Sequence, residues 1–310
     1  MRVFVAGASG AIGRPLVAQL LGAGHEVTGM TRRPERAEEI SAAGARGVVC
    51  DVFDPDALAA AVAEVRPEVV VHELTALPAD LDLRRKGVYA ANNRIRTEGT
   101  RNLVAAARAA GASRFVAQSI AFVYAPDDGP ATEDAPTLTA PGGEFEAALE
   151  ATFDLERQTV GAPGLDGLVL RYGFFYGPGT SYAPDGFQAG EVRRRRFPII
   201  GDGSGVFSYV HVDDAAAATV AACERGAPGI YNVCDDEPAA VRDWLPVYAA
   251  VLGAKPPRRV PRWLARLVAG SAVTAFATTL RGASNARVKA ELGWEPRWPS
   301  WRQGFREALG

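Results

Sequence analysis

The N-terminal half of the chain alternates between short apolar runs rich in valine and longer segments whose apolar residues recur at helical spacing. Strand and helix alternating at intervals of roughly 20 residues is the pattern of parallel strands joined by right-handed helical crossovers. Such crossovers cover both faces of a sheet, so we expect an α/β fold with a doubly wound parallel sheet. The expected strands span residues 3–6, 26–30, 47–50, 68–74, 114–119 and 167–172.

The first expected strand runs directly into a glycine-rich turn, GASGAIG, and then into a helix. Glycines let the backbone approach a pyrophosphate, and the helix N-terminus offers free N–H groups and the positive end of its dipole. The spacing is GxxGxxG, a variant of the GxGxxG fingerprint, and its alternative interpretation is a tight turn without a ligand. We predict a dinucleotide site. Its expected contacts are Gly7, Ser9, Gly10, Ala11, Ile12 and Gly13.

The end of the second expected strand bears on the choice between NADP and NAD. An enzyme that prefers NAD usually places a carboxylate there, whereas this chain has Arg32 and Arg33. Arginines pair with a 2'-phosphate, which favours NADP over NAD, although both arginines could simply form a solvated loop. After the third strand, Asp51 and Val52 are expected beside the adenine, with a helix cap near Pro55 as the alternative for Asp51.

The alternating pattern stops after Tyr172, where the Gly/Pro-rich stretch FFYGPGTSYAPDGF indicates a loop. Loops of this kind often handle the substrate. We expect residues 1–172 to form an NAD(P)-binding domain, to which residues 206–230 return. Residues 173–205 and 231–310 are expected to form a smaller, mostly helical substrate-binding lobe.

The net charge and the cysteine content of the chain indicate which kinds of partner and which cellular compartment to expect. A formal net charge of -2 gives no long-range attraction to nucleic acid or to anionic lipid, so we expect a small-molecule substrate and neither of those partners. Cys50, Cys223 and Cys234 are scattered and lack metal-ligand spacing, so we expect no metal and a reducing compartment. The strand-like N-terminus leaves no room for a secretory signal, which predicts a cytoplasmic protein.

Two local features stand apart from this balance. The basic run at residues 193–196 is interpreted as a solvated helix end rather than a phosphate-binding patch. The apolar stretch at residues 263–280 is interrupted by Arg266 and is interpreted as a buried or lid helix, with a membrane-surface role as the less favoured alternative.

Six motifs occur in a fixed order: GASGAIG, VVVHEL, TEGTRNLVAAARAAG, FVAQSIAFVY, LRYGFFYGPG and YVHVDDAAAA. Together they resemble the extended short-chain dehydrogenase/reductase family, usually described as NAD-dependent epimerases and dehydratases. The resemblance spans nearly the whole chain. It implies that the nicotinamide lies between the Rossmann domain and the substrate lobe. The residues implied to border it are Leu74, Thr75, Ala76, Ser119, Gly173, Phe174 and Phe175.

The same resemblance implies a catalytic serine or threonine and a Tyr-x-x-x-Lys pair, and here the sequence departs from the family. Lys86, Lys255 and Lys289 are the only lysines, and none follows a tyrosine by four residues. The usual serine slot holds Ile120, so Ser119 lies one residue early and is expected to point to the opposite face of its strand.

The missing lysine constrains the chemistry. A phenol with a pKa near 10 is only about 0.1% ionised at neutral pH, so a tyrosine without lysine is a poor base but a usable acid. This asymmetry favours reduction, in which hydride arrives and an acid then protonates the substrate oxygen. The candidate catalytic residues are Tyr124, Ser119, Tyr172 and Tyr176.

A second difference from the family pattern narrows the class of substrate that we expect. Relatives that bind sugar nucleotides carry an arginine before the VDD helix, and here that slot holds Phe207, which cannot pair with a diphosphate. We therefore expect an NADP(H)-dependent reductase of a small carbonyl-type compound or an intermediate of specialised metabolism. A non-redox isomerase, cyclase or lyase and a catalytically silent nucleotide sensor remain alternatives. Apolar helices at residues 92–110 and 145–160 would support a homodimer.

Overall fold

A computed structural model describes residues 1–78 and 86–309. Its central sheet has seven strands in the order β11-β6-β5-β4-β1-β2-β3, and every neighbouring pair is parallel. The prediction of a doubly wound α/β Rossmann fold is confirmed. The strands are β1 (Arg2–Ala6), β2 (Glu26–Thr31), β3 (Arg46–Val49), β4 (Val69–His72), β5 (Arg114–Ile120), β6 (Asp166–Tyr172) and β11 (Gly229–Val233).

The strand order reverses at β1, which places a crevice at the carboxyl ends of β1 and β4. Ala6 pairs with Met30 of β2 on one side and with His72 of β4 on the other, so the three strands end at the same level. In open α/β sheets, ligands bind outside the carboxyl ends of the strands at such a switch point. The glycine turn at residues 7–13 follows β1 directly into this crevice.

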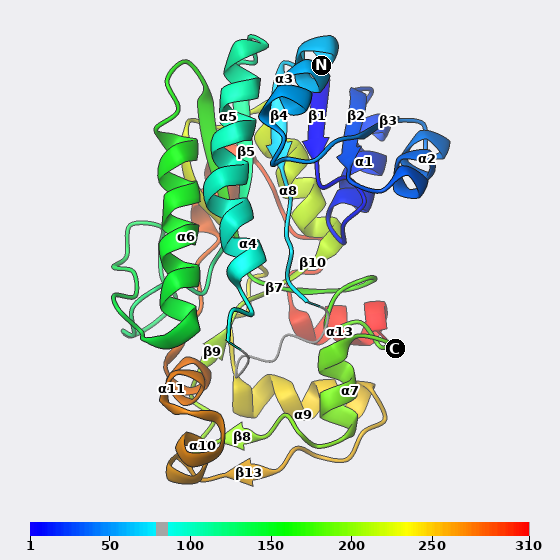
Figure 1. The fold of residues 1–310 in the computed structure, drawn as a ribbon. Helices are drawn as coiled ribbons and strands as arrows, with labels where there is room; N and C mark the ends of the chain where they lie inside the picture. Colours follow the sequence, from blue (N-terminus) through cyan, green and yellow to red (C-terminus); the bar gives the residue numbers. More distant parts are fainter. Residues whose placement is uncertain (79–85, 310) are drawn as a thin grey trace.

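Helices cover both faces of the sheet (Figure 1). Helices α1 (Gly13–Gly22), α8 (Val212–Glu224) and α12 (Ala286–Leu292) pack their apolar sides into one core. Helices α3 (Pro55–Val65), α5 (Thr100–Ala109) and α6 (Gly143–Val160) pack into a second core on the opposite face, while α2 (Pro34–Ala42) lies against β2 and β3. Helices α5 and α6 lie where the helices at residues 92–110 and 145–160 are expected, whereas α2 and α12 are not among the expected helices.

Helix α5 is continuous with α4 (Ala90–Arg94) through η1, a π-helical turn at Ile95–Gly99. A π-turn inserts an extra residue into the helical hydrogen-bond pattern and is frequent at functional sites. Periodicity alone predicts one regular helix over residues 92–110 and does not reveal this irregular turn.

A second, smaller body contains three two-stranded pairs. They are β7 (Phe174–Tyr176) with β10 (Tyr209–His211), β9 (Val206–Phe207) with β12 (Ala239–Ala240), and β8 (Ile199–Ile200) with β13 (Arg259–Val260). The helices of this part are α7 (Phe187–Arg193), α9 (Val241–Val251), α10 (Arg262–Ala269), α11 (Ser271–Thr279) and α13 (Trp301–Leu309). Its core is aromatic, with Tyr209, Trp244 and Phe305 fully buried.

From the sequence, we expect the second segment of the NAD(P)-binding domain to end at residue 230. In the structure, β11 of the large sheet extends to Val233, and α12 packs on β11 and α8, so the C-terminal part of the chain also contributes to the large sheet's surroundings. The division into two domains remains a prediction. Among the described residues, no helix combines the length and the apolar character that crossing a membrane requires.

Candidate nucleotide and substrate site

The glycine turn after β1 has no room for side chains at two positions. Gly7 has a φ of 98°, and a Cβ there would lie 2.6 Å from the backbone oxygen of Glu73. A Cβ on Gly13 would lie 2.2 Å from the Gly7 oxygen, so the turn packs tightly against both β4 and α1. Only glycine satisfies these two constraints.

A cleft of about 290 Å³ opens in front of this turn and the start of α1. Its opposite wall is the loop after β7 and the start of α8. A dinucleotide pyrophosphate fits such a setting, because a glycine turn at the start of a helix presents backbone N–H groups. The lining residues are Ser9, Gly10, Ala11, Arg14, Pro15, Pro178, Gly179, Val212 and Asp213.

Arg32 and Arg33 directly follow β2, and both are exposed. The Ser9 hydroxyl lies 3.4 Å from the hydroxyl oxygen of Thr31, so the glycine turn and the end of β2 are adjacent. Arg32 and Arg33 thus directly follow the strand end that lies next to the glycine turn, and their contact with a nucleotide remains a prediction.

The residues after β3 take two different roles. The Asp51 carboxylate accepts a hydrogen bond from the Phe53 N–H at 3.0 Å and closes a turn. The cap of α3 is Asp54, whose carboxylate accepts from the Ala57 N–H at 3.0 Å, so capping as the alternative role for Asp51 is wrong. Val52 is buried.

The segment after β4 connects the sheet to α4. The Ala76 N–H donates to the Asn92 side-chain oxygen at 3.1 Å, while Leu74 is half-buried and Thr75 is exposed. His72 is buried against Thr100, with 3.1 Å between Nε2 and the hydroxyl oxygen. Burial lowers the pKa of His72 to about 3, which keeps this imidazole neutral at physiological pH.

Glu73 points toward the other face of the sheet. Its carboxyl accepts a hydrogen bond from the Tyr172 hydroxyl at 3.2 Å, and the Tyr172 hydroxyl also lies 2.7 Å from the Thr219 hydroxyl. Burial raises the pKa of Glu73 to about 8, so this carboxyl is mainly protonated at neutral pH. Tyr172 is fully buried between these partners.

Ser119 and Tyr124 belong to one buried chain of polar contacts. The Ser119 hydroxyl donates to the Glu156 carboxylate at 2.6 Å, and Glu156 pairs with the Arg171 guanidinium at 2.6 Å. Arg171 also donates to the Tyr124 hydroxyl at 3.0 Å, which in turn donates to the Asn232 side-chain oxygen at 2.5 Å. Both hydroxyl groups are engaged with protein partners, and their expected catalytic roles remain predictions.

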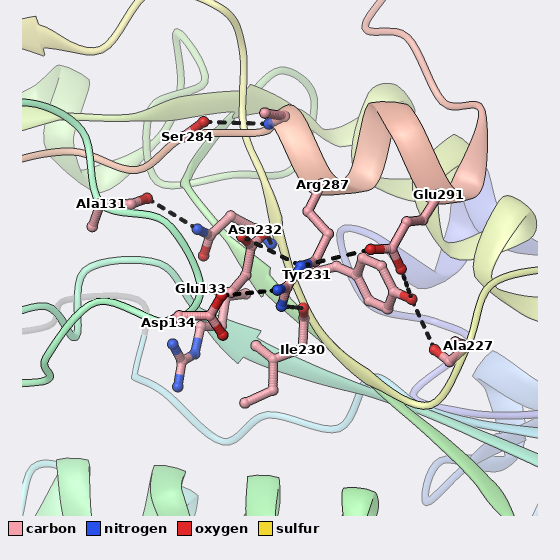
Figure 2. A network of polar contacts seen from close by, with 12 residues as sticks. Ala131, Glu133, Asp134, Ala227, Ile230, Tyr231, Asn232, Ser284, Arg287 and Glu291 are labelled. Carbon is pink, nitrogen blue, oxygen red and sulfur yellow. Dashed lines mark hydrogen bonds and ion pairs between the residues drawn. The ribbon is translucent and has the colours of Figure 1, made fainter.

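The chain of contacts continues through Asn232 into the network shown in Figure 2. The Asn232 side-chain amide donates to the Ala131 oxygen at 3.2 Å, and its backbone N–H donates to the Glu133 carboxylate at 2.8 Å. Arg287 of α12 pairs with Asp134 at 2.9 Å (Figure 2). These contacts hold the loop that follows Tyr124 against β11 and α12, which indicates a structural position for that tyrosine.

Tyr176, the remaining catalytic candidate, is fully buried in the aromatic core of the second body. Its ring packs on His211 and Phe305, with centroids 5.2 Å away in each case. Its hydroxyl has no hydrogen-bond partner among residues 1–78 and 86–309. Burial raises the pKa of Tyr176, and its catalytic assignment remains a prediction.

Helix α6 occupies the stretch between β5 and β6, and its sequence GEFEAALEATFDLERQTV contains neither tyrosine nor lysine. A positively charged side chain from the π-turn η1 contacts the buried face of α6. The Arg96 guanidinium, from the π-turn η1, donates to the Thr152 hydroxyl at 2.5 Å and to the Ala148 oxygen at 3.4 Å. Burial lowers the pKa of Arg96 to about 10, so the side chain stays charged at neutral pH.

Tyr89, at the start of α4, is close enough to Arg96 for the two groups to affect each other's ionisation. Burial raises the pKa of Tyr89 to about 12, and the Arg96 charge opposes that rise. Sequence reasoning missed both residues because it sought a lysine four positions after a tyrosine. The available signal was Arg96 itself, which shares the buried helical face of Thr100 and Leu103.

An aromatic wall adjoins the Gly173 segment. Phe174 stacks on Phe122 and on Phe207, with 4.5 Å between the ring centroids in both pairs. Phe276 of α11 meets Phe122 edge-on at 5.8 Å. Phe175 points the other way and packs on Tyr172 in the sheet core. The Phe122, Phe174 and Phe276 cluster offers flat apolar surface, which suits a planar substrate.

Comparisons with known proteins identify the family to which the chain is similar. The profile of the "NAD dependent epimerase/dehydratase family" matches residues 3–234. A "3-diazoavenalumate denitrifying reductase" from a Streptomyces species is 50% identical over 307 residues, covering 98% of this chain and 99% of the relative. A "2-alkyl-3-oxoalkanoate reductase" from Stenotrophomonas maltophilia is 29% identical over 82% of this chain and 76% of the relative.

Among solved structures, a UDP-glucose 4-epimerase from Thermus thermophilus in complex with NAD has a TM-score of 0.75 at 26% identity, with coverage of 100% of this chain and 98% of the other. The UDP-glucose 4-epimerase from Thermotoga maritima, with UDP-glucose, reaches a TM-score of 0.78 at 22% identity and 97% coverage of its own chain. Both structures share the fold, and the Thermus thermophilus structure shows NAD bound to a protein with this fold.

Proposed function

The chain belongs to the NAD dependent epimerase/dehydratase family, and we propose that it is an NADP(H)-dependent reductase that replaces the diazonium group of a small carboxylate substrate with hydrogen. The observation that carries this proposal is the composition of α6, which lacks tyrosine and lysine. The chain shares half of its residues with the relative named "3-diazoavenalumate denitrifying reductase", over nearly the full length of both.

The reaction explains why a strong acid–base pair is dispensable. The turn at residues 7–13 and the cleft in front of it would hold a nicotinamide nucleotide, which would supply a hydride to the carbon that carries the diazonium group. One C–H bond forms, the C–N bond breaks, and N₂ leaves with the electron pair of that bond, so atoms and charge balance without a proton. Carbonyl reduction, by contrast, needs an acid to protonate the developing alkoxide. A site without the family's tyrosine and lysine therefore fits hydride replacement of nitrogen.

The proposed cofactor contacts follow the crevice at the carboxyl ends of β1 and β4. The turn at residues 7–13 would hold the pyrophosphate, and Arg32 with Arg33 would pair with the 2'-phosphate of NADP. Asp51 and Val52 would border the adenine. The nicotinamide would lie between residues 74–76 and 173–175, with the aromatic wall beyond it.

Arg96 is the proposed electrostatic element of the substrate site. Its buried charge lies within interaction range of both Tyr89 and His72. In a poorly solvated site, a fixed cation attracts and orients an anionic substrate more strongly than the same charge does in water. Arg96 would thus favour a carboxylate-bearing substrate whose carbon skeleton stacks on the aromatic wall.

Reduction of a ketone is the second candidate. Two relatives at 29% identity carry the names "2-alkyl-3-oxoalkanoate reductase" and "4-hydroxy-2-methyl-3-oxo-4-farnesyl-3,4-dihydroquinoline-1-oxide ketoreductase". The required acid would be Tyr89, which is half-buried beside Arg96. Changing Tyr89→Phe separates the two reactions: ketone reduction would fall by about 10²-fold or more, and diazo removal would stay within about twofold.

The test of the proposal uses purified protein, NADPH and a panel of diazonium and oxo carboxylates under anaerobic conditions. We expect one N₂ released for each NADPH oxidised, measured by gas mass spectrometry and nucleotide absorbance. Oxidation of NADPH by oxo substrates alone would favour the second candidate. Binding of nucleotide without turnover of any substrate would instead support the sensor alternative, and turnover without nucleotide oxidation would support a non-redox enzyme.

A further inference from the structure

Helix α10 turns its apolar side outward. Trp263, Leu267 and Val268 are 64%, 77% and 69% exposed, whereas Ala265 on the opposite side is 5% exposed. Leu264, at 37%, completes the outward face. A helix of a globular protein normally buries its apolar stripe, so this face is built to meet something other than water.

The surroundings of this face are basic. Lys255, Arg258, Arg259, Arg262 and Arg266 are all exposed, and the sequence contains no aspartate or glutamate between Asp243 and Glu291. The whole chain has a formal net charge of only -2, so the positive charge is concentrated locally rather than spread over the molecule.

The fold adds the basic run at residues 193–196 to the same region. Arg259 of β13 pairs with Ile199 of β8, and the Arg195 side chain donates to the Pro256 oxygen at 3.1 Å. Glu191 offsets part of this charge through an ion pair with Arg194 at 3.4 Å. The basic run thus contacts the segment that leads through β13 into α10, and β8, β13 and α10 lie at the end of the molecule opposite β1 to β3 (Figure 1).

We propose that α10 and the surrounding arginines form a docking surface for an anionic membrane, to which the protein binds peripherally. Tryptophan and leucine on one side of a helix and arginine around it are the features of a helix that lies in the membrane interface. Anionic headgroups complement the arginines, and the apolar side chains enter the boundary of the acyl chains. This surface revises the expectation that the protein has no membrane partner.

The positive charge around α10 also favours an anionic membrane over a second copy of the chain as the partner of this surface. In a symmetric dimer through α10, Arg262 and Arg266 of one copy would face the same arginines of the other, and like charges across an interface are unfavourable. The position of α10 next to α11, which carries Phe276 of the aromatic wall, places the proposed membrane surface near the substrate side of the molecule.

The experiment is sedimentation of the full chain with large vesicles made of phosphatidylcholine alone or of equal parts phosphatidylcholine and phosphatidylglycerol. We expect binding only to the anionic vesicles, weakened by added salt. Leu267→Glu should lower the partition coefficient by roughly tenfold or more, and Arg258→Ala by about fivefold. Val160→Glu, at a 41% exposed apolar position on α6, is the matched control and should bind like the wild type.

Three outcomes would overturn the proposal. These are no binding to anionic vesicles, equal binding by the Leu267→Glu and wild-type proteins, and a dimer in light scattering that Leu267→Glu converts to a monomer. The last result would show that a second copy covers α10. Nucleotide binding measured on the same variants checks that they are folded, and it does not depend on which reaction the protein catalyses.

Discussion

At the scale of single residues, the proposed preference for NADP over NAD depends on the pair of arginines after β2. A charge-assisted contact to a phosphate contributes about 1.5–3 kcal/mol, which corresponds to roughly a tenfold to hundredfold change in affinity. We expect Arg32→Ala to weaken NADPH binding by about that factor and to leave NADH binding unchanged, as measured by titration calorimetry. Equal losses for both nucleotides would mean that the residue supports the fold of the loop instead.

Glu73 gives a pH-dependent prediction at the same scale. Its pKa is raised from the ordinary value of 4.5 to about 8 in the folded protein, so the folded state binds a proton that the unfolded state releases over this range. The stabilising effect is therefore full at acidic pH and is lost as pH rises through about 8.

The change Glu73→Gln should remove this dependence. The free energy of unfolding of the wild type should fall by up to about 1.4 kcal/mol per pH unit relative to the variant between the two pKa values. Urea unfolding of both proteins across that interval measures the difference. Parallel stability curves would show that Glu73 is already ionised in the folded protein.

At the scale of elements, sequence periodicity predicts the sheet strands and their helices well, because burial of one helix face or both sheet faces leaves a local pattern. The glycine turn is equally local, and its strand–turn–helix setting is confirmed. The pairing of Arg96 with α6 is not local, since the Thr152 hydroxyl that Arg96 contacts lies 56 residues later in the chain, and the contact depends on how the π-turn η1 packs against α6. Short strands such as β8 and β13 likewise form only through tertiary contacts.

The buried pair of Glu156 on α6 and Arg171 on β6 supplies an element-scale prediction. Removing one partner leaves an uncompensated buried charge, so Glu156→Gln should lower the free energy of unfolding by about 3–5 kcal/mol. Asp154→Asn on the exposed side of α6 is the matched control, expected to change stability by less than about 1 kcal/mol. Similar melting temperatures for both variants would contradict a structural role for this network.

At the scale of the whole molecule, the two bodies contribute different features. The parallel sheet has a crevice at the carboxyl ends of β1 and β4. The smaller body contributes the aromatic wall and helix α10, whose apolar face is exposed and surrounded by arginines. The sequence shows that α6 contains no tyrosine and no lysine. The proposed hydride replacement of nitrogen explains that composition only together with the crevice and the aromatic wall. An expected dimer through the helices at residues 92–110 and 145–160 remains a prediction.

The central claim is that hydride from the nucleotide, and no proton from solvent, replaces the departing nitrogen. Mass spectrometry of the product tests it most directly, with either deuterated NADPH in ordinary water or ordinary NADPH in heavy water. We expect one deuterium at the carbon that lost nitrogen in the first experiment and none in the second. Deuterium from heavy water at that carbon would contradict the account.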